Sequence, residues 1–241
     1  KQSLPEVTEE GLHLVPDSKL AVVYAEPGAD LAPYRRVKLL DAYVAFKKTW
    51  ARDQRSTGTR IQISSGDMNR IKNRMSEEFR VVFTEVLEEG GYPVVEEAGD
   101  DVLLIRPAIV DLNPTAPDTS RSQRTRNYVS SAGDMTLYVE LYDSQTGDML
   151  AKALDKRADG RYSNYYTWAN SASNKAAADR ILKGWATILL EAHRHLALGI
   201  GAGGDVVDRV QLEVLGGDLL HSRRDHGPPF GQIGRASCRE R

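Results

Sequence analysis

The stretch from Asp134 to Tyr142 alternates strictly between apolar and polar side chains, and this pattern limits the fold more than any other feature. A period of two is typical of a strand with one buried face. The buried face would carry Met135, Leu137, Val139 and Leu141, and the other face Thr136, Tyr138, Glu140 and Tyr142. Asp143 to Asp148 reads as a turn in which Gly147 can adopt a positive φ. Met149 to Asp155 then returns as the second strand of an antiparallel hairpin.

Two segments have the three- and four-residue apolar spacing of amphipathic helices, residues 67–89 and 174–198. Ser65 or Asp67 can cap the first helix, and Gly90-Gly91 supplies a left-handed stop. The apolar stripe of the first helix is Ile71, Met75, Phe79, Val82, Phe83, Val86 and Leu87; that of the second is Ile181, Trp185, Ile188, Leu189, Ala192 and Leu196.

Shorter apolar runs predict further strands over residues 20–24, 38–46, 92–95 and 101–112. Pro107 inside the last run favours a bulge or an edge position, because proline cannot donate to a ladder. Residues 51–59 read as a charged loop. The sequence therefore predicts an α+β fold, with a mainly antiparallel sheet and two long amphipathic helices packed on one face.

The 241 residues divide into four predicted parts. Residues 1–19 form a polar N-terminal spacer, residues 20–198 a single α+β domain, and residues 199–231 a glycine-rich tail. Residues 232–241 resemble the translation of a widely used DNA sequencing adapter, so we interpret them as a scar outside the fold. The single cysteine, Cys238, lies in that scar.

Composition narrows the function classes. A formal net charge of -2 gives no electrostatic basis for binding nucleic acid. No run approaches the roughly 20 apolar residues of a membrane-spanning helix. A domain without cysteine is compatible both with export to an oxidising compartment and with the cytosol.

The motifs that suggest chemistry have ordinary explanations. A dinucleotide-binding loop must follow a strand and open a helix. The glycines of residues 199–204 follow a predicted helix instead, and no clear helix comes after them. His193 and His195 are two apart, where metal ligands on a helix need a spacing of three or four, and we interpret them as charge near a helix end. Acidic pairs such as Asp100-Asp101 read as solvated carboxylates. We therefore predict no catalytic residue, no cofactor and no metal.

Two segments are candidates for contact with a partner. One is a serine- and threonine-rich loop that carries arginines and ends at Tyr128; the other is an aromatic segment, and amphipathic aromatics are enriched at interfaces. A charged loop kept in solution, and packing of the aromatic segment over the sheet, are the simpler alternatives. The candidate residues are Arg121, Arg124, Arg126, Tyr162, Tyr165, Tyr166 and Trp168.

Several of these features together resemble a known family. They are the helix ending in Gly90-Gly91-Tyr92, the strand start Asp100-Asp101-Val-Leu-Leu-Ile-Arg, the hairpin around residues 141–150 and the tryptophan-bearing Lys183-Gly-Trp-Ala. The chain resembles the domain-of-unknown-function 3313 family of bacterial lipoproteins over roughly residues 8–198. The resemblance implies a signal peptide and a lipidated cysteine upstream of Lys1, and it implies no catalytic residue because the family has no established activity.

The leading hypothesis is a non-enzymatic lipoprotein domain on the periplasmic side of the bacterial cell envelope, such as at the outer membrane. It would act through envelope proteins or cell wall, and it would meet a membrane only through its lipid anchor. The alternative is a hydrolase or small-molecule-binding enzyme with a site near the Arg121–Tyr128 loop and the Tyr162–Trp168 segment. A cytosolic binding module is a third interpretation.

Overall fold

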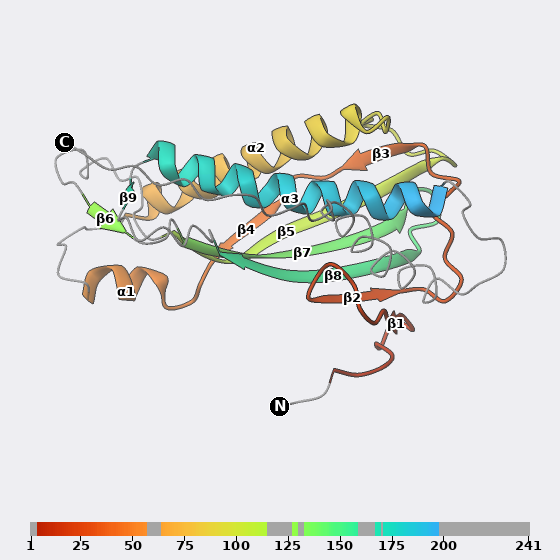
Figure 1. Cartoon of the computed structure of the whole chain (residues 1–241), viewed down its shortest axis with the longest axis horizontal. Coiled ribbons are helices and arrows are strands. Elements are labelled where there is room, and N and C mark those ends of the chain that lie inside the picture. Colours follow the sequence, from red (N-terminus) through yellow and green to blue (C-terminus); the bar gives the residue numbers. More distant parts are fainter. Residues whose placement is uncertain are drawn as a thin grey trace, which may run out of the picture.

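The structure is a computed structural model, and it contains two long helices and one large sheet (Figure 1). It describes residues 4–56, 64–114, 127–129, 133–158, 167–169 and 171–197. The elements in chain order are β1 (His13–Leu14), β2 (Val22–Ala25), β3 (Arg36–Leu39), β4 (Tyr43–Phe46), α1 (Trp50–Ser56), α2 (Ser65–Glu89), β5 (Val102–Pro114), β6 (Asn127–Val129), β7 (Gly133–Asp143), β8 (Met149–Ala158), β9 (Thr167–Ala169) and α3 (Ser171–Ala197).

Seven strands form one mixed sheet in the order β1-β2-β8-β7-β5-β3, with β4 also paired to β5. The central hairpin β7–β8 is antiparallel as predicted, and so are the β5–β7, β2–β8 and β1–β2 pairs. Both β3 and β4 run parallel to β5. The α+β class is confirmed, and the sheet contains two parallel neighbours where the hairpin pattern suggested mainly antiparallel pairing.

The strand predicted over residues 38–46 is two strands, and Pro107 explains the division. Leu40 N donates to Ile105 O at 3.0 Å, so the odd-numbered backbone groups of this part of β5 face β3 and β4. Pro107 lies between Ile105, where the β3 pairing ends, and Ala108, where the β4 pairing begins. Pro107 therefore lies in the gap between the two pairings, where its missing N–H removes no hydrogen bond from the sheet. Pro107 lies in a central strand, and the expectation of an edge position was wrong.

The helix α2 begins two residues earlier than predicted. Its N-cap is Ser64, whose hydroxyl accepts from Asp67 N at 3.1 Å, while the Asp67 carboxylate accepts from Ser64 N at 3.1 Å. This reciprocal capping box satisfies two amide donors at the helix start. At the other end Gly91 has φ +89°, the left-handed conformation that the sequence predicted for the stop.

The prediction of a charged loop over residues 51–59 was wrong for its first part, because residues 50–56 form the short helix α1. Trp50 is fully buried, its ring stacks on Phe46 at 4.2 Å, and its Nε1 donates to Pro114 O at 3.1 Å. The last contact joins residues 64 positions apart. A long-range anchor of this kind explains a helix whose own sequence is mostly polar.

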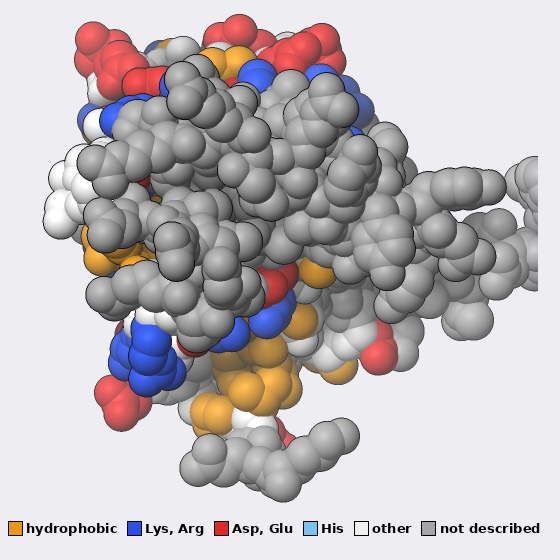
Figure 2. Space-filling model, turned by 90° about the vertical axis from the view of Figure 1, so that its left-hand side faces the viewer, with side chains coloured by type: hydrophobic (Ala, Val, Ile, Leu, Met, Phe, Trp, Pro, Cys, Tyr) orange, Lys and Arg blue, Asp and Glu red, His pale blue; other side chains and the backbone are white. Residues whose placement is uncertain are grey.

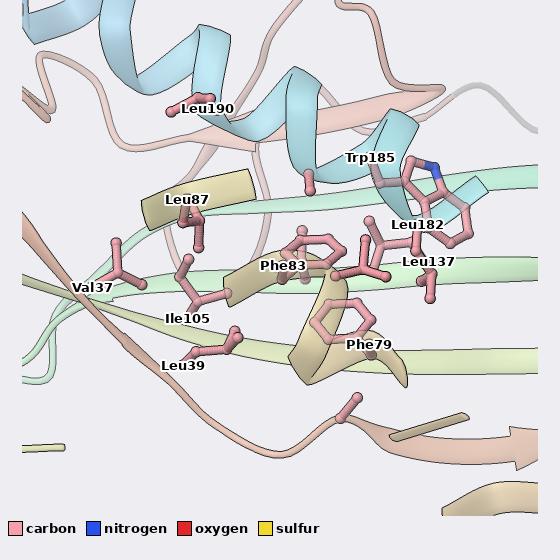
Figure 3. Packing of buried hydrophobic residues seen from close by; sticks show 14 of the residues in the cluster. Val37, Leu39, Phe79, Phe83, Leu87, Ile105, Leu137, Leu182, Trp185 and Leu190 are labelled. Atoms are coloured by element: carbon pink, nitrogen blue, oxygen red, sulfur yellow. The ribbon is translucent and has the colours of Figure 1, made fainter. Parts of the chain in front are cut away.

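The hydrophobic core lies between the sheet and the layer made by α2 and α3 (Figure 3). Phe79 and Phe83 of α2 stack at 3.9 Å, and Trp185 of α3 is buried beside them. The inward side chains of β7 are the four that the alternation predicted, Met135, Leu137, Val139 and Leu141. Both long helices cover the same face of the sheet, as predicted (Figure 1). The two long helices leave the opposite face uncovered, and the short helix α1 lies beyond one end of the sheet (Figure 1).

Candidate contact surface

Most of the predicted contact residues lie outside the described residues. These are Arg121, Arg124, Arg126, Tyr162, Tyr165 and Tyr166. Trp168 lies in β9, where its backbone pairs with that of Tyr128 in β6. The antiparallel β6–β9 pair therefore joins the ends of the two segments that the sequence singled out, although they are about 40 residues apart in the chain.

The face of the sheet without helices carries a row of side chains that crosses five strands. Neighbouring strands place these residues directly opposite one another: Tyr43 and Ala108, Ala108 and Tyr138, Tyr138 and Leu154, Leu154 and Val22. We call Val22, Tyr43, Ala108, Tyr138 and Leu154 the open-face row. Tyr43 and Leu154 are exposed, and the other three are half-buried. An apolar row of this kind on a sheet face is unusual for a surface that meets only water.

A buried carboxylate lies next to this row. Glu140 accepts hydrogen bonds from Tyr138 Oη at 2.6 Å and Tyr142 Oη at 3.0 Å, and it forms an ion pair with Arg106. The Arg106 guanidinium also lies over the Tyr142 ring, 5.2 Å from its centre. Burial, and then the hydrogen bonds to Glu140, raise the pKa of both tyrosines. A carboxylate whose two oxygens are held by three donors keeps a fixed position, so this cluster is suited to holding the surface rigid.

The N-terminal segment before β2 lies on this same side of the sheet, away from the helices (Figure 1). Tyr24 Oη donates to Pro5 O at 2.9 Å, and Lys152 Nζ bonds to Glu10 at 2.8 Å. The hydrogen bond from Lys152 lowers the pKa of Glu10 to about 2. Leu12 is buried, whereas Leu4 and Val7 are exposed. The segment thus covers part of the open face and extends its apolar surface.

Seen from one end, the molecule shows hydrophobic side chains gathered on its lower side, with Lys and Arg side chains beside them (Figure 2). The exposed Tyr43 and Leu154 were not predicted as contact residues. The alternation in residues 134–142 indicated that Tyr138 would point away from the core. Only the strand register shows that Tyr43, Ala108, Leu154 and Val22 line up with it.

His193 differs from its interpretation as a charged residue at a helix end. Its ring is buried, with its centre 4.2 Å from that of Tyr92 in an edge contact. Burial lowers its pKa to about 4, so it is neutral at pH 7. Within the described residues neither ring nitrogen has a hydrogen-bond partner. The part of the chain that the structure describes also contains no group of three metal-ligating side chains.

The structure is an α+β domain with one covered and one open sheet face. The sequence of this domain matches the model of a known protein family. The chain belongs to the family described as "Protein of unknown function (DUF3313)", whose sequence model matches residues 13–189. The resemblance noted in the sequence is therefore confirmed. No curated protein matches the chain. No helix within the described ranges is both long and apolar enough to cross a membrane.

Several solved structures are similar to the chain. The PelC dodecamer from Paraburkholderia phytofirmans is 13% identical, with 69% of this chain and 96% of that chain covered and a TM-score of 0.36. A minor lipoprotein from Acinetobacter baumannii is 9% identical, with 69% and 94% covered and a TM-score of 0.31. A Xanthomonas campestris protein of family DUF330 is 14% identical, with 68% and 85% covered and a TM-score of 0.33.

Proposed function

We propose that this chain is a non-enzymatic lipoprotein domain of the bacterial cell envelope that acts through contacts with envelope proteins or cell wall. The observation that carries the proposal is the one-sided sheet. Its helix-covered face buries the core, and its other face presents the open-face row with the exposed Tyr43 and Leu154. Exposed apolar surface rimmed by polar groups is characteristic of an interaction site.

The polar groups around the row support contact rather than catalysis. Both oxygens of Glu140 are engaged by Tyr138, Tyr142 and Arg106. A general acid or base needs an oxygen that can reach a substrate, and such residues are usually tuned toward neutral pKa values. The location on the periplasmic side and the lipid anchor are part of the proposal, and they rest on what the resemblance to the family implies.

The alternative, a hydrolase or small-molecule-binding enzyme, has one supporting observation. The pairing of Tyr128 with Trp168 joins the ends of the two segments that would build its site. Turnover of ester or glycoside substrates by the purified chain, lost on substitution of Arg124 or Tyr165, would favour it.

The complete gene provides the test of the envelope location. We expect it to encode a signal peptide that ends in a lipidated cysteine upstream of Lys1. The expressed protein should then appear in the membrane fraction, take up a radiolabelled fatty acid, and move to the soluble periplasmic fraction when that cysteine is replaced by serine. A gene that begins with a plain methionine at the domain edge, with a protein found in the cytosol, would overturn the proposal.

A further inference from the structure

The segment that precedes β2 folds back on itself. Thr8 N donates to Leu12 O at 2.9 Å, and Leu14 N donates to Glu6 O at 2.8 Å, so the two arms of the segment form a short hairpin. We call residues 4–14 the strap; its last two residues are β1. These hydrogen bonds join the strap to itself, so it is a small unit with an internal structure of its own.

The strap covers the part of the open face that β2 and β8 form. Tyr24 and Lys152 lie directly opposite each other, and they share the face of the open-face row because each lies two residues from a member of that row. Tyr24 Oη donates to Pro5 O at 2.9 Å, and Lys152 Nζ bonds to Glu10 at 2.8 Å. Beneath the strap the Lys152 side chain is only 17% exposed. Both side chains are therefore covered while the strap is docked.

The attachment of the strap is separate from the main core. Leu12 is 2% exposed and Tyr24 7%, and both lie outside the cluster of buried residues that the structure describes between the sheet and the long helices. The strap lies on the side of the sheet away from α2 and α3 (Figure 1). Opening the strap would cost the local burial of these two side chains and the two-residue pairing of β1 with β2, and it would leave the core contacts in place.

Lys152 has a second carboxylate beside it in the sheet. Its directly opposite neighbour in β7 is Glu140, and the neighbour of Glu140 in β5 is Arg106. Charges therefore alternate along one line, from Arg106 through Glu140 and Lys152 to Glu10 on the strap. When the strap leaves, Lys152 still faces Glu140, so it avoids the large cost of a buried charge that has lost its only partner. The line of charges thus accommodates both the docked and the open strap.

From this construction we infer that the strap is a hinged cover, which opens as one unit while the sheet and the long helices stay folded. The docked strap keeps Tyr24 and Lys152 from a partner, and the open strap exposes them beside the open-face row. Val15 N donates to Val23 O at 2.9 Å, and this bond fixes the end about which the strap turns. The inference rests on the proposed contact role of the open face and adds to it a control of access.

Amide hydrogen exchange of the 241-residue chain, measured residue by residue by NMR, tests the opening. The amides of Thr8, Leu12 and Leu14 are hydrogen-bonded in the docked strap. We expect these three amides to share one opening constant, on the order of a hundredfold larger than that of the amides in β7 and β8. A graded series of constants along the strap would indicate fraying and overturn the inference. Exchange of the strap amides at the rate of β7 and β8 would overturn it as well.

Two leucine variants separate the strap from the core. Leu12→Ala should raise the opening constant of the strap roughly a hundredfold, as expected for a truncated buried leucine, and leave exchange in β7 and β8 unchanged. Leu182→Ala truncates a leucine that is fully buried in the core, so it should raise exchange in β7 and β8 and leave the strap amides unchanged. A Leu12→Ala variant that raises exchange equally in the strap and in β7 and β8 would overturn the inference.

A milder pair of variants lies on the strap itself. Glu10→Gln removes the ion pair with Lys152 and should raise the opening constant of the strap about threefold, because a solvent-exposed ion pair contributes little. Glu9→Gln, at the exposed neighbouring position, makes the same chemical change and should leave the constant as it is in the parent. Equal constants in these two variants would contradict the role of the ion pair in holding the strap.

Acetylation of lysines by a soluble reagent, followed by mass spectrometry, tests whether the strap controls access. Lys152 and Lys156 lie on the same strand and face, and their side chains are 17% and 64% exposed. Leu12→Ala should raise the acetylation rate of Lys152 about tenfold relative to that of Lys156, and an unchanged ratio would overturn the inference. None of these measurements needs a partner. A gene without a signal peptide would therefore sink the proposed envelope location and leave the strap results standing, whereas a strap that does not open would sink only this inference.

Discussion

The indole Nε1 of Trp185 donates a hydrogen bond to Asp155 Oδ2 across 2.7 Å, and this bond ties the middle of α3 to strand β8. The same carboxylate accepts from Ala21 N at 3.1 Å and from Arg157 Nε at 2.8 Å. Asp155 pairs with Leu137 in the sheet and is buried on the helix-facing side. One charged side chain therefore joins the helix, the strand and the segment that leads into β2.

Asp155→Ala should lower the free energy of unfolding by about 2–4 kcal/mol. The substitution leaves the buried indole N–H and the amide of Ala21 without their acceptor, and an unsatisfied buried donor costs more than a hydrogen bond gains. Urea denaturation followed by tryptophan fluorescence measures the change. Asp41→Ala is the control: its carboxylate is mostly exposed and pairs with Arg80, so the loss should stay below about 1 kcal/mol. Similar losses in the two variants would contradict the assigned role.

Gly90→Ala should destabilise the contact between α2 and α3 by about 1–3 kcal/mol. A Cβ at residue 90 would lie 2.4 Å from Leu190 Cδ1, so the two helices must move apart or Leu190 must change its rotamer. Gly90 has φ -72°, so the cost arises from crowding and not from backbone strain. Urea denaturation midpoints measure the effect.

Gly66→Ala provides the matched control in the same helix. Its Cβ would lie 3.6 Å from Ser64 Oγ, an ordinary contact, and alanine is the better helix former. We expect a gain of about 0.4–1 kcal/mol. A destabilised Gly66→Ala with an unchanged Gly90→Ala would show that the helix contact is looser than described.

The parts of the fold that local pattern determines could be predicted from the sequence. The alternation in residues 134–142 predicted both the strand and its buried face, and the apolar stripe of residues 71–87 predicted α2. What failed depends on contacts distant in the chain. The helix α1 exists because Trp50 reaches Pro114, and the division between β3 and β4 depends on Pro107 in another strand.

The candidate surface could be predicted only in fragments. The pattern of β7 placed Tyr138 and Glu140 away from the core. It contained no signal that Tyr43 and Leu154 would join Tyr138 in one row, because strand order and register are not local properties. His193 was misread for a similar reason. The residue that buries it, Tyr92, lies about 100 positions earlier, and the helix periodicity of α3 does not reveal that contact.

Trp50→Ala should cost about 3–5 kcal/mol of unfolding free energy, the usual loss for a buried aromatic side chain. The substitution removes the stack on Phe46, the hydrogen bond to Pro114 and a fully buried ring. Tyr43→Ala, an aromatic truncation at an exposed position in β4, should change stability by no more than about 0.5 kcal/mol. Thermal and urea unfolding of both variants measure the difference, and a loss below that of Tyr43→Ala would contradict the burial of Trp50.

Stability should fall on acidification through the range in which His193 titrates. Its pKa is lowered to about 4 in the folded chain, first by burial and also by the positive charge of Arg35, from the 6.5 of an unperturbed histidine. Between these two values the unfolded chain binds more protons than the folded chain. The contribution of the neutral His193 to the free energy of unfolding is therefore fully present above pH 6.5, and it decreases as the pH falls to about 4. The total is on the order of 3 kcal/mol.

The difference between parent and variant isolates this contribution from that of the carboxylates. His193→Leu keeps an apolar side chain against Tyr92 and has no proton to bind. Its stability should therefore change less than that of the parent between pH 6.5 and pH 4, the two values that bracket the titration. Urea midpoints across this range measure both chains, and parallel curves for the parent and His193→Leu would show that the imidazole is not buried in the folded state.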